Sequence, residues 1–411
     1  MLRLLMDTLW EREEINMLYD KGKLDCQPSE VGYDGSREEV LIRHFEKMME
    51  QKKIQCASYC VSRKGKIFMN GAVGPRSYEA DCQEPLAADS VHRIASVTKT
   101  FCAVAIMQLV ENGYFRLDTP VGNILPQFNT PPYNQILVFH LLTHTSGLRA
   151  DENAFEDKYE VSPWKYIEAY AKMHKSQDFD WLEVALSCGL TKPVGEQWQY
   201  SSFGFVVLGA VIEKVTGMRA YEYIEENICK PLHMDQTKFF IDQDMAKKCI
   251  YRDEKSKEIL QQIAEGKEVH DEDEGTIWEK IPPTGGFLAS SSRDLVRYGN
   301  MLLNKGRMDG ARILGRKSVE KMTTLAIHNI PDHCWGSTCL DRQYGIGFDM
   351  RAGMPWLYSD GTFMHEGAGA CSMIIDPVEE MVAAWFVPFT DEDWHDDCLY
   401  NVTNIIWSGL I

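Results

Sequence analysis

Residues 93–113 read RIASVTKTFCAVAIMQLVENG, and this stretch decides how the rest of the chain is interpreted. Ser96 and Lys99 stand three residues apart at its start, and a run of apolar residues follows them. A helix formed by this run is apolar around most of its circumference, so we expect it to pass through the interior. The pair is therefore either a nucleophile with its base, or a helix start with a solvated lysine nearby.

The expected burial favours the catalytic interpretation. Residues three apart share one face of a helix, so the Lys99 amine can reach the Ser96 hydroxyl. Burial disfavours the ammonium form and lowers the pKa of a lysine, which makes the amine a usable proton acceptor. The N–H groups and positive field at a helix N-terminus also favour the negative charge that develops when a serine attacks a carbonyl.

The Ser-x-x-Lys spacing alone is weakly specific. It also occurs at Ser162/Lys165 and at Ser318/Lys321. Both of these pairs lie in polar surroundings typical of a helix start, where the serine caps the helix and the lysine is solvated.

Strands are predicted near both ends of the chain, and helices in the middle. The hydrophobic spacing predicts a helix over 37–52, then two short strands around a turn at Lys64 and Gly65. A second hairpin is predicted around Asp376 and Pro377, followed by a closing helix.

Helical segments are predicted between about 136 and 245. The most persuasive is SSFGFVVLGAVIEKVTG, which has serines at its start and Gly217 just past its end, as helix capping favours. A further helix is predicted over Ser292 to Asn304.

The short turns between neighbouring strands predict an α+β fold (α/β, two regions). We expect an antiparallel β-sheet flanked by N- and C-terminal helices, with an inserted mainly α-helical domain. Residues 37–92 and 281–411 are assigned to the sheet domain, and residues 93–280 to the helical domain, with an acidic surface loop near 253–280. Residues 1–36 form an N-terminal extension that stays unassigned. The groove between the two domains is the expected place of a site.

Composition excludes several classes of partner. The 411 residues carry a formal net charge of -18, which argues against nucleic acid. The apolar part of MLRLLMDTLWEREE is too short for a secretory signal, and the longest apolar runs fall short of the roughly 18 residues of a membrane span. Twelve scattered cysteines are expected to be reduced thiols. We therefore expect a cytoplasmic protein of undetermined oligomeric state.

His140 and His144 stand four residues apart and could in principle share a metal ion. The stretch HLLTH lacks a glutamate after its first histidine, so it is not the zinc protease signature. No metal and no cofactor are expected. A metalloenzyme that uses these histidines with acidic residues remains a competing hypothesis.

Six segments resemble, in their order and near their spacing, those of the serine β-lactamase-like family. They are RIASVTKTF, LLTHTSGL, GEQWQYSSFGFVVLGAVIEKVTGM, KPLHMDQTKF, GGFLASSSRDLVRYGNMLL and HEGAGA. This family, similar to peptidase family S12, includes class C β-lactamases, D-Ala-D-Ala carboxypeptidases, D-aminopeptidases and related esterases. The resemblance covers roughly residues 45–400 and implies a β-lactamase/transpeptidase-like fold.

The resemblance also implies roles for individual residues. Ser96 matches the acylated nucleophile and Lys99 its partner. Tyr200, which opens YSS, matches the tyrosine that exchanges a proton with the nucleophile and later with the leaving group. His365 is assigned to the catalytic set because it opens the third motif, usually Lys-Thr-Gly or His-x-Gly on a strand edge.

Further residues complete the implied site. The backbone N–H groups of Ser96 and Ala368 are the expected oxyanion hole. Gly367 would allow substrate to approach the strand closely. Glu366 and Ser202 are the remaining expected substrate contacts, although strand alternation could turn Glu366 away from the groove.

Two departures from the family pattern bear on the substrate. Ser202 stands where β-lactamases and carboxypeptidases commonly place Asn, so it keeps a hydroxyl but lacks an amide. His365 replaces the lysine of true β-lactamases, which weakens the case for a fixed cation that recognises a β-lactam carboxylate.

The expected function is that of a serine hydrolase that forms a covalent acyl-enzyme. Its expected substrate is an ester, an amide or a D-amino-acid peptide, either a small molecule or a short peptide. Two alternatives stay open: a non-catalytic β-lactamase-like binding protein, and a weak β-lactamase or penicillin-binding activity.

Overall fold

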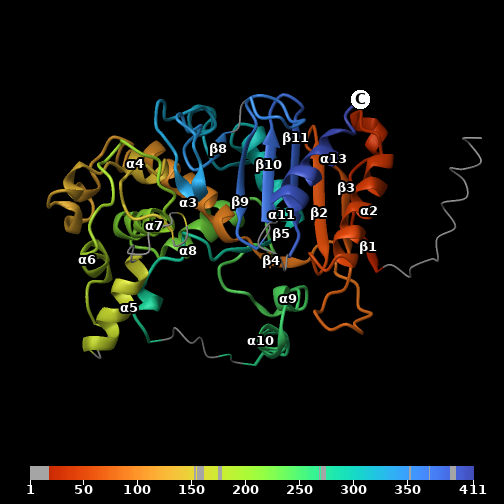
Figure 1. Cartoon of the computed structure of the whole chain (residues 1–411), viewed down its shortest axis with the longest axis horizontal. Coiled ribbons are helices and arrows are strands. Elements are labelled where there is room, and N and C mark those ends of the chain that lie inside the picture. The colour runs from red at the N-terminus through yellow and green to blue at the C-terminus, as the bar shows by residue number, and fades with distance from the viewer. Residues whose placement is uncertain are drawn as a thin grey trace, which may run out of the picture.

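The computed structural model describes residues 18–151, 154, 162–174, 178–267, 269, 275–350, 353–369, 371–388 and 395–411. A seven-stranded sheet lies beside a group of helices (Figure 1). The strand order is β1-β3-β2-β11-β10-β9-β8, and every neighbouring pair is antiparallel. The predicted antiparallel α+β fold is therefore confirmed.

The strands of this sheet are short and come from both ends of the chain. They are β1 (Tyr19–Lys21), β2 (Ala57–Arg63), β3 (Lys66–Val73), β8 (Asp349–Met350), β9 (Phe363–Gly367), β10 (Cys371–Asp376) and β11 (Met381–Phe386). Two small pairs lie outside it: β4 (Val91–Arg93) with β5 (Ala289–Ser291), and β6 (Arg307–Met308) with β7 (Ala311–Arg312).

Some helices cover the sheet, and most of the others are formed by the part of the chain between the early strands (β1–β3) and the late strands (β8–β11). They are α2 (Ser36–Glu50), α3 (Thr98–Glu111), α4 (Val138–Leu142), α5 (Pro163–His174), α6 (Trp181–Leu186), α7 (Ser202–Thr216), α8 (Ala220–Ile224), α9 (Gln243–Ala246), α10 (Glu254–Ala264), α11 (Ser292–Leu303), α12 (Arg316–Met322) and α13 (Val402–Trp407). Two short segments matter below: the 3-10 turn η2 (Ala95–Val97) and the π-helical segment η9 (His395–Asn401).

Both faces of the sheet are buried, and the alternation along β11 separates two cores. Met381, Ala383 and Trp385 belong to the core under α2 and α13. Val382 and Ala384 belong to the larger core that contains α11, α3 and α7. Successive side chains of a strand point to opposite faces, so each residue of β9, β10 and β11 has an assigned side.

Helix α3 runs through the larger core, as its sequence predicts. Its residues from Thr98 to Met107, and Leu109, are buried. Helix α7 packs against it and shows the predicted caps. The Ser201 hydroxyl accepts the Gly204 N–H, and Gly217 ends the helix at a φ of 73°. The two helices therefore pack against each other in the core on one side of the sheet.

Most predicted elements are found where the sequence placed them. The helix expected over 37–52 is α2, and the two hairpins are β2 with β3 and β10 with β11. The assignment of 37–92 with 281–411 to one domain and of 93–280 to another stays a prediction.

One sequence-based expectation needs correction. The acidic stretch 253–280 is not a plain surface loop, because α10 forms there over Glu254–Ala264, where the Asp253 carboxylate caps the Ser256 N–H. The region 1–36, which the sequence left unassigned, supplies β1 at the sheet edge. Residues 1–17, 268 and 270–274 lie outside the described residues.

The two ends of the described chain are joined. The Asp34 N–H donates to the Gly409 carbonyl at 2.7 Å, and the Tyr33 hydroxyl donates to the Ile406 carbonyl at 2.8 Å. In the sheet, β2 pairs with β11 along its whole length. Early and late segments therefore build one unit.

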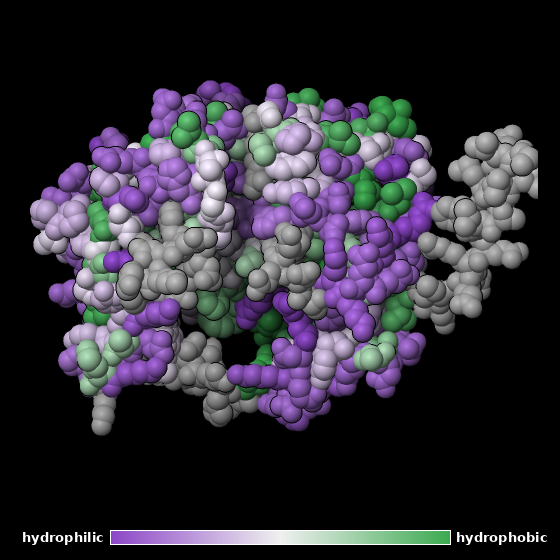
Figure 2. Space-filling view, viewed as in Figure 1, coloured by the Kyte–Doolittle hydropathy of each residue, from purple (hydrophilic) through white to green (hydrophobic). Residues whose placement is uncertain are grey.

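The surface, the helix lengths and the cysteines are those of an ordinary globular chain. Hydrophilic residues cover most of the sheet side in the face shown by Figure 2. Within the described ranges, each helix is too short or too polar to cross a lipid bilayer. All twelve cysteines are free thiols.

Replacing Gly299 by alanine tests how tightly α11 packs on the sheet. A Cβ at Gly299 would lie 2.4 Å from Val382 Cγ1 in β11. Overpacking of this kind costs about 1–3 kcal/mol, so Gly299→Ala is expected to lower the free energy of unfolding by that amount in urea titrations.

The matched control is Gly204→Ala in α7. A Cβ there would meet Leu141 Cδ2 at 3.8 Å, which is ordinary contact. Because alanine favours a helix over glycine by up to about 1 kcal/mol, this variant is expected to be as stable as the wild type or slightly more so. Equal destabilisation by both substitutions would contradict the packing explanation.

Candidate active site

Ser96 lies in the tight turn η2, directly before α3. Ala95 precedes it with a φ of 42°, in the left-handed region that side chains with a Cβ rarely adopt. Such strain costs on the order of 1–3 kcal/mol and persists where the surroundings impose it. The end of β9 lies very close to this turn: a Cβ on Gly367 would lie 2.3 Å from the Ile94 carbonyl oxygen. The turn that carries Ser96 is thus pressed against the end of β9.

The Lys99 amine lies beside the Ser96 hydroxyl and away from water. Its Nζ is 2.9 Å from Ser96 Oγ, and it donates to the Gly285 carbonyl at 2.7 Å. The side chain is fully buried, and this burial lowers the pKa of Lys99 from its usual 10.5 to about 8. A substantial fraction of the amine is therefore neutral near pH 8, with a lone pair free to accept the serine proton.

Tyr200 completes a group of three side chains. Lys99 Nζ lies 4.8 Å from the centre of the Tyr200 ring. Burial, and then the charge of Asp151, raise the pKa of the Tyr200 phenol well above its usual value. The phenol thus stays protonated at neutral pH and is available as a proton donor.

His144 packs behind Tyr200. Their ring centres are 4.5 Å apart, and His144 Nδ1 accepts the Ser201 N–H at 3.1 Å. Burial lowers the pKa of His144 well below its usual value, so the ring is neutral and carries its proton on Nε2. His144 therefore holds the tyrosine segment in place.

The two histidines considered for a metal ion each accept a hydrogen bond from a backbone N–H. His140 Nδ1 accepts the Leu137 N–H at 3.1 Å, and His144 Nδ1 accepts the Ser201 N–H. In the part of the chain that the structure describes, no group of three His, Cys, Asp or Glu side chains is arranged to hold a metal ion. This geometry does not support the metalloenzyme hypothesis.

His365 faces the side of the sheet that holds the Ser96 turn. Its ring centre is 6.4 Å from that of Tyr200, and its Nδ1 donates to the Glu366 carbonyl at 2.7 Å. Burial, together with the nearby Lys99 charge, lowers the pKa of His365 to about 4. The imidazole is therefore neutral and presents an unprotonated Nε2, which can accept a hydrogen bond but supplies no positive charge.

Glu366 takes the other side of β9. Alternation along the strand places it with Met364, on the face covered by α2 and α13. Its carboxylate lies 3.3 Å from His395 Nε2 in η9. In this position the Glu366 side chain contacts η9. A role of Glu366 in substrate binding stays a prediction. The oxyanion role of Ala368, which is exposed in the turn after β9, also stays a prediction.

Ser202 is held by a residue that the sequence did not point to. Its N–H and its hydroxyl both donate to the Asp151 carboxylate, at 2.6 and 2.5 Å. The Asp151 N–H in turn donates to the Tyr200 carbonyl at 2.9 Å. Asp151 lies 51 residues before Ser202 in no recognisable motif, so only the folded chain brings the two together.

Trp335 is a second residue that sequence reasoning missed. Its ring centre is 5.4 Å from that of Tyr200, yet 59% of the residue is exposed. Its N–H donates to the Ala154 carbonyl at 2.7 Å, and its φ is 51°. An exposed indole held next to the tyrosine forms a wall beside the site.

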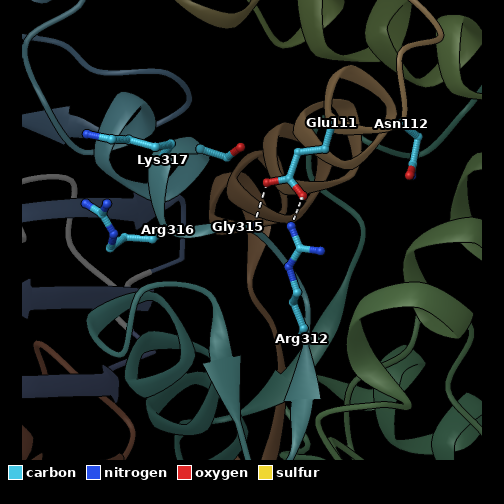
Figure 3. Close-up of a pocket in the computed structure, with 7 residues that line it drawn as sticks. Glu111, Asn112, Arg312, Gly315, Arg316 and Lys317 are labelled. Carbon is cyan, nitrogen blue, oxygen red and sulfur yellow. Dashed lines mark hydrogen bonds and ion pairs between the residues drawn. The ribbon is translucent and has the colours of Figure 1, made fainter.

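A separate depression of about 450 Å³ lies at the other end of α3. Figure 3 shows Glu111 directed at Gly315 and Arg312, whose N–H groups lie 2.6 and 3.2 Å from its carboxylate oxygens. These charges are paired within the protein. The depression is therefore distinct from the Ser96 site at the start of the helix.

Comparison with solved structures assigns the class of fold. Simvastatin synthase (LovD) from Aspergillus terreus superposes with a TM-score of 0.68 and 20% identity, over 90% of this chain and 98% of that one. This likeness shows a β-lactamase/transpeptidase-like fold. Residues 41–397 also match the family model described as Beta-lactamase. The chain belongs to the beta-lactamase family.

Curated relatives come from several bacteria. Esterase EstB from Burkholderia gladioli is 32% identical over 46% of this chain and 48% of its own. Protein Rv1367c from Mycobacterium tuberculosis is 27% identical over 64% of this chain and 66% of its own. The matched regions thus span two thirds or less of these relatives.

The burial of Lys99 predicts a pH dependence of stability. Folding lowers its pKa from 10.5 to about 8, so the unfolded chain binds more protons between these values, and stability rises with pH there. Relative to Lys99→Met, the wild type is expected to gain about 2 kcal/mol of unfolding free energy between pH 7 and 9.5, measured in urea. A difference between the two proteins that is constant with pH would show that the amine is not buried.

Proposed function

We propose that this protein is a serine hydrolase that forms an acyl-enzyme on Ser96, with an ester, an amide or a D-amino-acid peptide as substrate. The observation that carries the proposal is the buried Lys99 amine 2.9 Å from Ser96 Oγ. A surface lysine would be an ammonium ion at neutral pH and could not take the serine proton. Membership of the beta-lactamase family and the relative named as an esterase support the same class of reaction.

The proposed reaction begins with proton transfer from Ser96 to neutral Lys99. Ser96 Oγ attacks the substrate carbonyl, and the N–H groups of Ser96 and Ala368 receive the negative charge on the carbonyl oxygen. The protonated Tyr200 phenol donates to the leaving alcohol or amine and is reprotonated from Lys99. The acyl group then remains on Oγ as an ester.

Deacylation uses the same groups with water in place of the leaving group. Water loses its proton to the Lys99 and Tyr200 pair, attacks the acyl carbonyl and releases the acid, while the proton returns to Ser96 Oγ. His365, neutral and buried, would accept a hydrogen bond from substrate at Nε2.

The charge of the site argues against an efficient β-lactamase. A β-lactam carries a carboxylate, and binding it calls for a cation. His365 is neutral, and Asp151 lies beside Tyr200 and Ser202. Esters and amides without a carboxylate fit this site better.

Covalent labelling tests the proposed nucleophile. A fluorophosphonate is expected to add one phosphonyl group to the wild type, seen by intact-protein mass, with the modified peptide containing Ser96. Ser96→Ala is expected to stay unmodified while its circular dichroism and thermal unfolding match the wild type. A folded wild type that resists fluorophosphonates and penicillins alike would favour the non-catalytic binding alternative.

The rate of acylation is expected to depend on the protonation of Lys99. Below a pKa near 8 the fraction of neutral amine falls, so the burst rate with an activated ester is expected to drop about tenfold per pH unit. Stopped-flow measurements with p-nitrophenyl acetate from pH 6 to 9 provide the profile. A rate that is flat over this interval would exclude Lys99 as the base.

A further inference from the structure

Asp151 places a carboxylate next to two residues of the proposed site, Tyr200 and Ser202. Its carboxylate is half-buried and accepts hydrogen bonds from the Ser202 N–H and hydroxyl, at 2.6 and 2.5 Å. Both donors are neutral, and no ion pair joins Asp151 to an arginine, lysine or histidine among the described residues. Each carboxylate oxygen has a second lone pair, so the group can still accept from a ligand.

The charge of Asp151 acts directly on the two groups that move protons. It raises the pKa of Lys99, against the larger effect of burial, and it raises the pKa of Tyr200. The effect on Lys99 opposes the proposed chemistry, because it favours the ammonium form of the base. A cation bound next to Asp151 would cancel this effect.

An exposed tryptophan, Trp335, is hydrogen-bonded to the segment that carries this carboxylate. The N–H of Trp335 donates to Ala154, three residues after Asp151, and the Trp335 ring lies 5.4 Å from that of Tyr200. Trp335 is 59% exposed, so much of its side chain is accessible to a ligand. Faces of tryptophan attract ammonium groups through the ring quadrupole.

Among the residues that the structure describes, the nearby Arg342 and His365 are paired or neutral. Arg342 lies over the Trp198 ring at 4.4 Å and is paired with Asp349 at 2.9 Å. His365 is neutral. A substrate carboxylate would therefore meet the charge of Asp151, whereas a substrate ammonium would meet a carboxylate and an aromatic side chain together.

We propose that the site takes esters or amides that carry an ammonium group, bound between the Asp151 carboxylate and the Trp335 indole. This inference rests on the proposed acyl-enzyme function and specifies its substrate class. The ammonium group belongs either to the acyl part or to the leaving group of the substrate. The experiment below distinguishes these two positions.

Two pairs of isosteric substrates test the inference. On the acyl side, p-nitrophenyl 6-aminohexanoate is compared with neutral p-nitrophenyl heptanoate. On the leaving-group side, acetylthiocholine is compared with S-(3,3-dimethylbutyl) thioacetate. The wild type is expected to prefer the cationic member of one pair by about tenfold in kcat/KM, as one well-placed charge contact provides.

Two variants identify the residues responsible. Asp151→Asn keeps the shape of the side chain and is expected to remove most of that preference, while Trp335→Leu is expected to reduce it about threefold by removing the aromatic face. The ratio within each pair cancels any general loss from a shifted Ser202. The control Glu39→Gln removes one exposed charge on α2 and is expected to keep the wild-type ratio.

The outcomes separate this inference from the function on which it rests. If Ser96 is labelled and neutral esters are cleaved, but both pairs show equal kcat/KM for their members, the ammonium site is wrong and the hydrolase stands. The same holds if Asp151→Asn lowers both members of each pair equally. If the folded wild type is never acylated, both proposals fail together.

Discussion

The buried amine of Lys99 is the constraint on which the site depends. A lysine kept out of water destabilises the folded chain at neutral pH, because its ammonium form loses hydration that the interior replaces only in part. Helix α3 tolerates this since it is packed on almost every side by α7, α11 and the sheet core. The same burial that costs stability gives the amine a lone pair near pH 8. Burial of Lys99 thus lowers the stability of the fold and at the same time makes the amine a usable base.

The sheet supplies the second requirement, which is a rigid partner for the Ser96 turn. Alternation along β9 sends His365 and Gly367 toward the turn and Glu366 toward η9. The absence of a side chain at Gly367 lets the Ile94 carbonyl approach β9, directly before Ala95 with its unusual conformation. One strand therefore fixes the backbone before the proposed nucleophile and presents an imidazole beside it.

Local patterns predicted the fold well because its elements carry strong local signals. The apolar run after Ser96, the serine and glycine caps around 202–216 and the two hairpins each depend on neighbouring residues. The sequence pattern and the family resemblance also named Ser96, Lys99, Tyr200 and His365, which the fold brings together. Asp151 and Trp335 escaped notice because their proximity to Tyr200 is a product of tertiary folding alone. The helix α10 was overlooked because its acidic, polar face outweighed a narrow apolar stripe.

The pairing of β2 with β11, and of the 33–34 segment with 406–409, has a consequence for biosynthesis. A ribosome releases β2 long before it makes β11. The edge of β2 that later pairs with β11 is therefore unpaired while the helical middle of the chain is synthesised. Strand edges of this kind readily pair with other chains. A nascent polypeptide stalled before β11 would lack the strand that covers this edge.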